Sequence, residues 1–146
     1  TGWVFVQVLL LGVAFFLPVY MGQGFGQSPV IGALAFGLVV LGLGLVLLGA
    51  LHLGGSLKPF PMPKPNATLQ VAGLYRFVRH PIYAGAVLAV LGWSLWWHSW
   101  PGVLWTLLVF AFFDRKAAYE ERWLVARFPE YRHYRQRTAK FFPFVY

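Results

Sequence analysis

The apolar stretch VIGALAFGLVVLGLGLVLLGALHLGG, residues 30–55, decides the fold class of this chain because it contains no charged residue. A helix of about 20 residues is long enough to cross the hydrocarbon core of a bilayer. In the whole chain only 11% of residues are charged and 59% are hydrophobic, whereas soluble domains carry about 25% charged residues. The stretch therefore predicts a membrane-spanning helix. The composition argues against a soluble globule and excludes a disordered chain.

Three further apolar stretches flank this one in the sequence. The first has Gln7 as its only side chain that resists burial, and it lacks the basic lead and small-residue cleavage site of a signal peptide. The last two are short, but the turn at residues 98–102 joins them into a predicted helical hairpin, whose second helix continues past Phe113. Tryptophans near this turn indicate an interfacial belt; they are Trp96, Trp97 and Trp100.

These stretches predict an all-α integral membrane protein that forms a single domain over residues 1–146. We expect about four transmembrane helices and a cytoplasmic helical extension at the C-terminal end. The four predicted spans cover about residues 3–20, 30–53, 82–97 and 101–113.

The charged residues predict how the chain sits in the membrane. The chain has 12 basic and 4 acidic residues, all of them between the second and third spans or after Phe113. Since positively charged loops remain on the cytoplasmic side, both termini are expected there. Basic residues between apolar runs indicate anionic membrane lipids as partners rather than nucleic acid.

The residue types also limit the chemistry of the chain. It has no cysteine, which excludes disulfides, zinc–thiolate sites and thiol nucleophiles. The four histidines are scattered without the spacing of a metal site, so we expect no metal. The segment LKPFPMPKP, residues 57–65, contains four prolines and cannot be helical. It is either a rigid, polyproline-like strap over a site or a spacer.

Small residues in the second and third spans indicate close helix packing. In the third span Gly85, Ala89 and Gly92 share one helix face. The glycines of the second span could serve packing within the chain or a dimer, so the oligomeric state stays open.

The first polar cluster is GLYRFVRHPIYAG, residues 73–85. Pro81 suits the first turn of a helix, with His80 at its cap and Arg79 just before it. The unpaired N–H groups of such a helix end, next to these two side chains, form an anion site. Tyr75 and Tyr83 add aromatic surface and hydroxyls. The alternative is that these arginines and tyrosines only anchor the helix end at the interface.

The second polar cluster is the adjacent pair Glu120 and Glu121, two of the four acidic residues of the chain. A helical projection places Glu120 on an apolar stripe with Phe113, and Glu121 at the edge of that stripe. A carboxylate in that position needs a partner. The partner is either a basic residue of the same helix, Lys116 or Arg127, or a bound cation.

The segment FPEYRHYRQR, residues 128–137, alternates aromatic and basic residues. It is typical of an amphipathic segment lying on anionic headgroups, while a second interpretation has Arg135 or Arg137 closing a pocket. Together with the two polar clusters it offers an anion site, carboxylates and aromatic rings. S-adenosylmethionine is a ligand that needs all three, and the residues make it plausible without selecting it.

The order and spacing of these motifs resemble a known family, the isoprenylcysteine carboxyl methyltransferase and phospholipid N-methyltransferase superfamily, over about residues 54–143. The motifs are Gly73-x-Tyr75-x-x-x-Arg79-His80-Pro81-x-Tyr83-x-Gly85, Glu120-Glu121-x-x-Leu124, Phe128-x-x-Tyr131-x-x-Tyr134 and a late Pro143. The resemblance implies an integral membrane methyltransferase that binds S-adenosylmethionine near the cytosolic surface. It implies a cofactor region over about residues 73–85 and 114–143. The cofactor-binding residues expected there are Tyr75, Arg79, His80, Pro81, Tyr83, Gly85, Glu120 and Glu121.

The expected function is direct methyl transfer from S-adenosylmethionine, with S-adenosylhomocysteine as product, to a lipid or other membrane-embedded amphiphile. A carboxylate acceptor would be oriented by Arg135 or Arg137. An amine acceptor would need a base, which Glu120, Glu121 or His80 could provide. Two alternatives remain. One is an NADPH-dependent reductase of the sterol-reductase type, which shares a related Arg-His-Pro-x-Tyr-x-Gly segment, and the other is a non-catalytic membrane scaffold.

Overall fold

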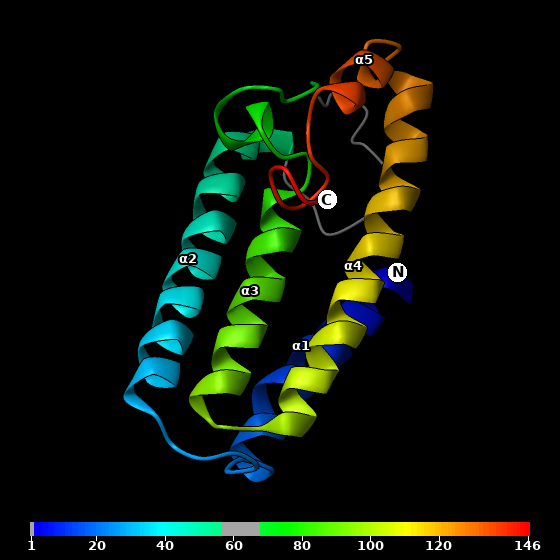
Figure 1. Cartoon of the computed structure of the whole chain (residues 1–146). Helices are drawn as coiled ribbons and strands as arrows, with labels where there is room; N and C mark the ends of the chain where they lie inside the picture. The colour runs from blue at the N-terminus through cyan, green and yellow to red at the C-terminus, as the bar shows by residue number, and fades with distance from the viewer. Residues whose placement is uncertain (1, 57–67) are drawn as a thin grey trace.

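The computed structural model describes residues 2–56 and 68–146. Four long helices make up most of this part of the chain, and Figure 1 shows how they are arranged. These are α1 (Gly2–Tyr20), α2 (Pro29–Leu53), α3 (Pro81–Trp96) and α4 (Trp100–Arg127). The shorter elements are the 3-10 turns η1 (Gly54–Ser56) and η2 (Gly73–Arg76) and the helix α5 (Tyr131–Gln136). The predicted all-α class is confirmed for the described residues. The predicted proline-rich strap at residues 57–65 lies outside them.

Helices α1 and α2 are long and apolar enough to cross a membrane, with mean hydropathies of 2.2 and 2.7. Their bounds agree with the first two predicted spans to within one residue. Most of their large side chains face outward, among them Phe5, Phe16 and Leu47, as expected for helices surrounded by lipid. Helix α3 is a shorter apolar helix. Helix α4 runs without a break past Phe113, as predicted.

Helices α2 and α3 pack with their backbones in close approach. A Cβ atom added at Gly42 would lie 2.5 Å from the carbonyl oxygen of Gly85, and one added at Gly92 would lie 2.7 Å from the carbonyl oxygen of Ala35. The packing face predicted for the third span is therefore confirmed at Gly85 and Gly92. By contrast, a Cβ at Gly44 would meet no atom within 4 Å.

Helix α1 is held differently, through tryptophan side chains of its neighbours. The indole of Trp93 on α3 donates to the carbonyl oxygen of Phe15 at 2.8 Å, and that of Trp105 on α4 donates to the carbonyl oxygen of Leu10 at 3.0 Å. The ring of Phe15 also stacks on Trp93, with 5.2 Å between the ring centroids. α1 is thus joined to α3 and α4 by side-chain contacts rather than by backbone approach.

The C-terminal segment folds back between α3 and α4 (Figure 1). A parallel bridge pairs Val78 with Ala139, and Phe141 is 2% exposed. The helical part of the chain after Phe113 is the end of α4 together with α5, which ends at Gln136. Residues 137–146 are not helical, because this segment bonds to the chain just before α3 and buries Phe141 there.

Candidate cofactor site

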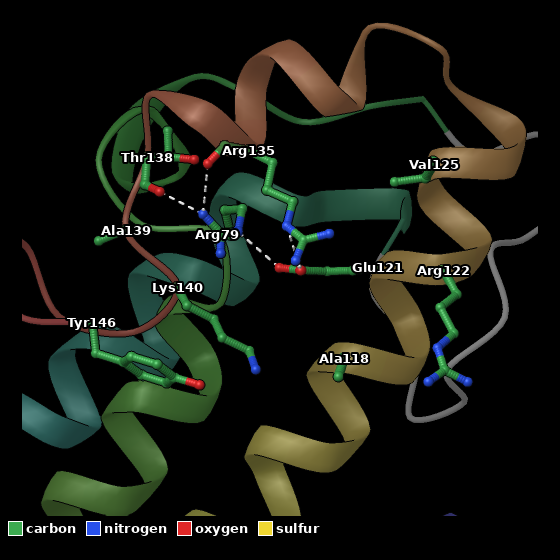
Figure 2. Close-up of a pocket in the computed structure, with 10 residues that line it drawn as sticks. All are labelled: Arg79, Ala118, Glu121, Arg122, Val125, Arg135, Thr138, Ala139, Lys140 and Tyr146. Atoms are coloured by element: carbon green, nitrogen blue, oxygen red, sulfur yellow. Dashed lines mark hydrogen bonds and ion pairs between the residues drawn. The ribbon is translucent and has the colours of Figure 1, made fainter.

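The predicted site residues from the start of α3 and from α4 meet around the carboxylate of Glu121, as Figure 2 shows in part. Arg79 donates through Nε to Glu121 Oε1 at 2.7 Å, and His80 Nε2 lies 3.0 Å from the same oxygen. The hydroxyl of Tyr131 on α5 lies 3.4 Å from it. The Glu121 side chain is 5% exposed. This buried carboxylate of α4 is therefore in contact with residues at the start of α3 and with α5.

The charge on Glu121 is fixed by these neighbours. Burial alone would raise the pKa of its carboxyl group, but hydrogen bonds and charges from His80 and Arg79 outweigh burial and lower the pKa to about 2. Glu121 is therefore ionised at neutral pH. A further cation, Arg135, has its Nε 3.5 Å from Glu121 Oε2 with a side chain that is 57% exposed.

The helical projection of the carboxylate pair was wrong. Phe113, Ala117 and Glu121 form the buried stripe of α4, and Glu120 is the more exposed acid, with a side chain that is 17% exposed. The partners of Glu121 come from a distant part of the chain and from α5. A projection of α4 alone does not include partners from other elements, so it could not decide which of the two adjacent acids is the more buried.

Glu120 lies one position away and contacts a different set of groups. The Tyr83 hydroxyl donates to Glu120 Oε1, and His80 Nδ1 is 3.8 Å from Glu120 Oε2. The His80 ring thus lies between the two carboxylates. Lys116, one of the predicted partners of Glu120, donates to Gln7 on α1 at 2.6 Å and lies 5.2 Å from the centre of the Tyr83 ring.

Arg79 is also fixed through backbone carbonyl groups. Its Nη1 donates to the carbonyl oxygen of Arg135 at 3.0 Å and to that of Thr138. The dashed lines in Figure 2 mark these contacts. Arg79 therefore ties α4, α5 and the C-terminal segment together. These contacts explain why the Arg79 side chain is only 9% exposed.

Three tyrosines form the layer that docks α5. Tyr134 donates its hydroxyl hydrogen to the carbonyl oxygen of Tyr75, and Tyr75 donates to the carbonyl oxygen of Gly49 at the end of α2 at 3.2 Å. Burial is the main cause that raises the pKa of Tyr75, Tyr131 and Tyr134. Their hydroxyls are consequently neutral hydrogen-bond donors. Tyr75 does not line the cavity. Through these two hydrogen bonds it connects α5 to the end of α2.

A cavity of about 750 Å³ opens beside Glu121. Figure 2 shows Arg79 and Arg135 converging on Glu121 at one side of it, with Lys140 and Tyr146 projecting from the C-terminal segment. The lining residues are Arg79, Ala118, Glu121, Arg122, Val125, Arg135, Thr138, Ala139, Lys140 and Tyr146. The cavity wall is therefore rich in basic groups around one carboxylate.

Of the predicted site residues, Arg79, Glu121 and Arg135 line the cavity, whereas the other seven do not: Tyr75, His80, Pro81, Tyr83, Gly85, Glu120 and Arg137. Pro81 is buried in the first turn of α3. Gly85 faces α2, where an added Cβ would collide with the carbonyl oxygen of Gly42. Arg137 is exposed after α5 and does not line the cavity.

Arg122, Thr138, Lys140 and Tyr146 line the cavity but were not predicted as site residues from the sequence. The C-terminal segment reaches the cavity through backbone pairing with the chain before α3, and no local pattern marks such pairing. Among the described residues, no group of three or more His, Cys, Asp or Glu could hold a metal ion.

Fold and cavity together describe a helical membrane protein with a charged cavity at one end of its bundle. Residues 30–131 match the family model described as phospholipid methyltransferase. Because this match covers more than half of the chain, the chain belongs to the phospholipid methyltransferase family. The predicted resemblance is thereby confirmed.

Two curated relatives are similar in sequence. The cobalt-zinc-cadmium resistance protein CzcN of Cupriavidus metallidurans is 32% identical over 109 residues, which cover 71% of this chain and 47% of CzcN. The steroid 5-alpha-reductase DET2 of Solanum lycopersicum is 30% identical over 118 residues, which cover 75% of this chain and 41% of DET2. The chain thus spans less than half the length of these relatives.

A solved structure has a similar fold. It is that of the eukaryotic intramembrane Ras methyltransferase ICMT, isoprenylcysteine carboxyl methyltransferase. The TM-score is 0.76 at 22% sequence identity, and the match covers 96% of this chain and 52% of that one. The family and the two apolar helices place this chain in a membrane.

Proposed function

We propose that this chain is an S-adenosylmethionine-dependent methyltransferase that acts on a lipid or another membrane-embedded amphiphile at the cytoplasmic membrane surface. One observation carries the proposal. In a chain of this family, Arg79 and His80 from the start of α3 meet Glu121 from α4 at a cavity of about 750 Å³. Ligand pockets commonly have volumes of roughly 300–1,000 Å³.

The cavity suits a ligand that carries both signs of charge. S-adenosylmethionine has an ammonium group and a carboxylate, and the cavity presents a carboxylate and several basic side chains. Arg135 and Arg122, both exposed and both on the cavity wall, would hold the cofactor carboxylate. Glu121 is the carboxylate on the cavity wall but is bound to Arg79 and His80. Glu120 does not line the cavity, but it is the adjacent and more accessible acid and would hold the ammonium. Tyr146 offers an aromatic face on the same wall.

The bound cofactor supplies a methyl group on a positively charged sulfur. The protein residues contribute binding and orientation, and holding two reactants in line contributes up to about 7–11 kcal/mol in favourable cases. Glu121 acts by fixing Arg79 and His80, to which it is bound.

The acceptor decides whether a base is needed. A carboxylate acceptor would need only a cation to orient it, and Arg135, which lines the cavity, is better placed for this than Arg137. An amine acceptor would need a base. Glu121, with a pKa of about 2, is a weak base at neutral pH, so Glu120 or His80 would take that role.

In the membrane we propose that α1 to α4 are four spans with both termini on the cytoplasmic side. The end of α2 and the start of α3 then face the cytoplasm together with the cavity. The acceptor would enter from the bilayer. The exposed basic residues of α5 and its end would contact anionic headgroups; they are Arg132, Arg135 and Arg137.

The test is calorimetric titration of the detergent-purified chain with S-adenosylhomocysteine, and with NADPH in parallel. We expect micromolar binding of S-adenosylhomocysteine and none of NADPH. Glu120→Gln should abolish binding, while Glu130→Gln, which changes an exposed acid before α5, should bind as the unaltered chain does. Normal binding by Glu120→Gln would refute the assignment of Glu120.

The two alternatives predict different titrations. Binding of NADPH alone would favour a reductase, to which the similarity to DET2 and the related Arg-His-Pro-x-Tyr-x-Gly segment point. Binding of neither compound by the folded chain would favour a scaffold. Once binding is found, lipids with carboxylate or amine headgroups in mixed micelles would identify the acceptor by methyl transfer.

A further inference from the structure

Asp114 is the one acid of α4 that the proposed site does not use. Its Oδ1 accepts a hydrogen bond from Lys140 Nζ at 2.5 Å and another from the Tyr146 hydroxyl at 2.9 Å. Lys140 Nζ also donates to the carbonyl oxygen of Asp114 at 3.2 Å. Both donors line the cavity, so Asp114 bonds to two cavity residues without lining the cavity itself.

The two donors belong to one closed unit, residues 140–146, which we call the C-terminal hook. The backbone N–H groups of Lys140 and Phe141 both donate to the carbonyl oxygen of Tyr146, at 2.7 Å and 3.0 Å. Phe141 packs in the core against Ala84 of α3 and Ala117 of α4. Because the hook is closed on itself, a contact at Tyr146 constrains Lys140 as well.

The residues next to the hook hold the backbone of the proposed cofactor residues. The N–H of Arg79 donates to the carbonyl oxygen of Ala139 at 2.9 Å, and the N–H of His80 donates to that of Lys140 at 3.0 Å. The Arg79 side chain donates to the carbonyl oxygen of Thr138. Movement of the hook would therefore move Arg79 and His80 relative to Glu121.

We propose that Asp114 is a positioning residue of the site. By binding Lys140 and Tyr146 it fixes the hook against α4. The hook in turn holds the backbone of Arg79 and His80 and one wall of the cavity. The part of this inference that concerns ligand affinity rests on the proposed function, whereas the part that concerns the backbone does not.

The test compares Asp114→Ala with Arg115→Ala, which removes an exposed charge from the adjacent position of α4. Hydrogen exchange followed by mass spectrometry would report on the amides of Arg79 and His80. We expect these amides to exchange about tenfold faster in Asp114→Ala, because local opening becomes easier, and at the unaltered rate in Arg115→Ala. The dissociation constant of S-adenosylhomocysteine should rise about tenfold in Asp114→Ala.

Two further variants distinguish a local effect of Asp114→Ala on the site from general misfolding of that variant. Tyr146→Phe removes one of the two side-chain bonds to Asp114 and keeps the ring, so it should show a smaller change in the same direction. Lys140→Met combined with Asp114→Ala should add little to Asp114→Ala alone, since both remove the same contact.

Unchanged exchange at Arg79 and His80 in both Asp114→Ala and Tyr146→Phe would overturn the proposal. So would faster exchange with unchanged affinity, because Asp114 would then brace the hook without positioning the site. If the unaltered chain binds no S-adenosylhomocysteine, the proposed function fails, and the exchange rates alone decide whether Asp114 holds the backbone of Arg79 and His80.

Discussion

Replacing Glu121 by glutamine should destabilise the fold at neutral pH by about 3 kcal/mol. The pKa of Glu121 falls from 4.5 to about 2 in the folded chain. Each pKa unit corresponds to about 1.4 kcal/mol of preference for the charged form. Glutamine keeps the shape of the side chain but leaves Arg79 and His80 without their buried anionic partner, which is a costly arrangement.

Thermal unfolding of the detergent-purified chain measures this effect. A loss of about 3 kcal/mol corresponds to a fall in Tm of roughly 6–12 °C for a domain of this size. Glu130→Gln is the matched control, since it removes an exposed acid, and its Tm should stay near that of the unaltered chain. Equal unfolding temperatures for Glu121→Gln and the unaltered chain would refute the reasoning.

The pH dependence gives a second check on the same variant. The folded pKa of Glu121 lies below its ordinary value of 4.5, so the stabilisation is fully present above that value. It is lost as the pH falls toward 2. The difference in stability between the unaltered chain and Glu121→Gln should therefore narrow between about pH 5 and pH 2. A difference that stays constant over that range would mean that the charge of Glu121 is not its source.

Two further predictions use pairs of neighbouring residues. Gly42→Val should lower the stability of the bundle by about 1–3 kcal/mol or more through overpacking, because an added Cβ would lie 2.5 Å from backbone atoms of α3. Gly44→Val, with no atom within 4 Å of its added Cβ, should leave the Tm unchanged. An equal change in Tm for Gly42→Val and Gly44→Val would contradict the packing of α2 against α3 described above. Arg135→Ala should weaken S-adenosylhomocysteine binding about tenfold, while Arg137→Ala should not, since only Arg135 lines the cavity. Calorimetric titration measures both, and a larger loss for Arg137→Ala would refute that assignment.

The long helices could be predicted from the sequence because a bilayer imposes a length and a composition on each span. The bounds of α1 and α2 follow directly from where the apolar runs end. Proline at the start of α2, α3 and α4 adds a local signal that fixes the first turn. The packed face of α3 was also predictable, since Gly85 and Gly92 recur at helical spacing.

Of the residues that line the cavity, Arg79, Glu121 and Arg135 could be predicted from the sequence, but their arrangement could not. Glu121 faces inward because Arg79 and His80 compensate its charge, and these two lie about 40 positions earlier in the sequence. The bond between Asp114 and Lys140 likewise joins two polar residues that each look solvent-exposed when taken alone. Such pairings arise only when distant segments meet, so helical periodicity contains no information about them.

The close approach of α2 and α3 has a consequence for how the bundle could open. Because the backbones of α2 and α3 are in contact, neither helix can slide or rotate unless the two helices separate along their whole contact. They would therefore move together as one rigid unit. Helix α1 lies on its neighbours through indole bonds to carbonyl oxygens and through ring contacts. These bonds can break and reform one at a time. If the acceptor is a lipid, as proposed above, a sideways entrance for its tail would therefore open along α1 rather than between α2 and α3.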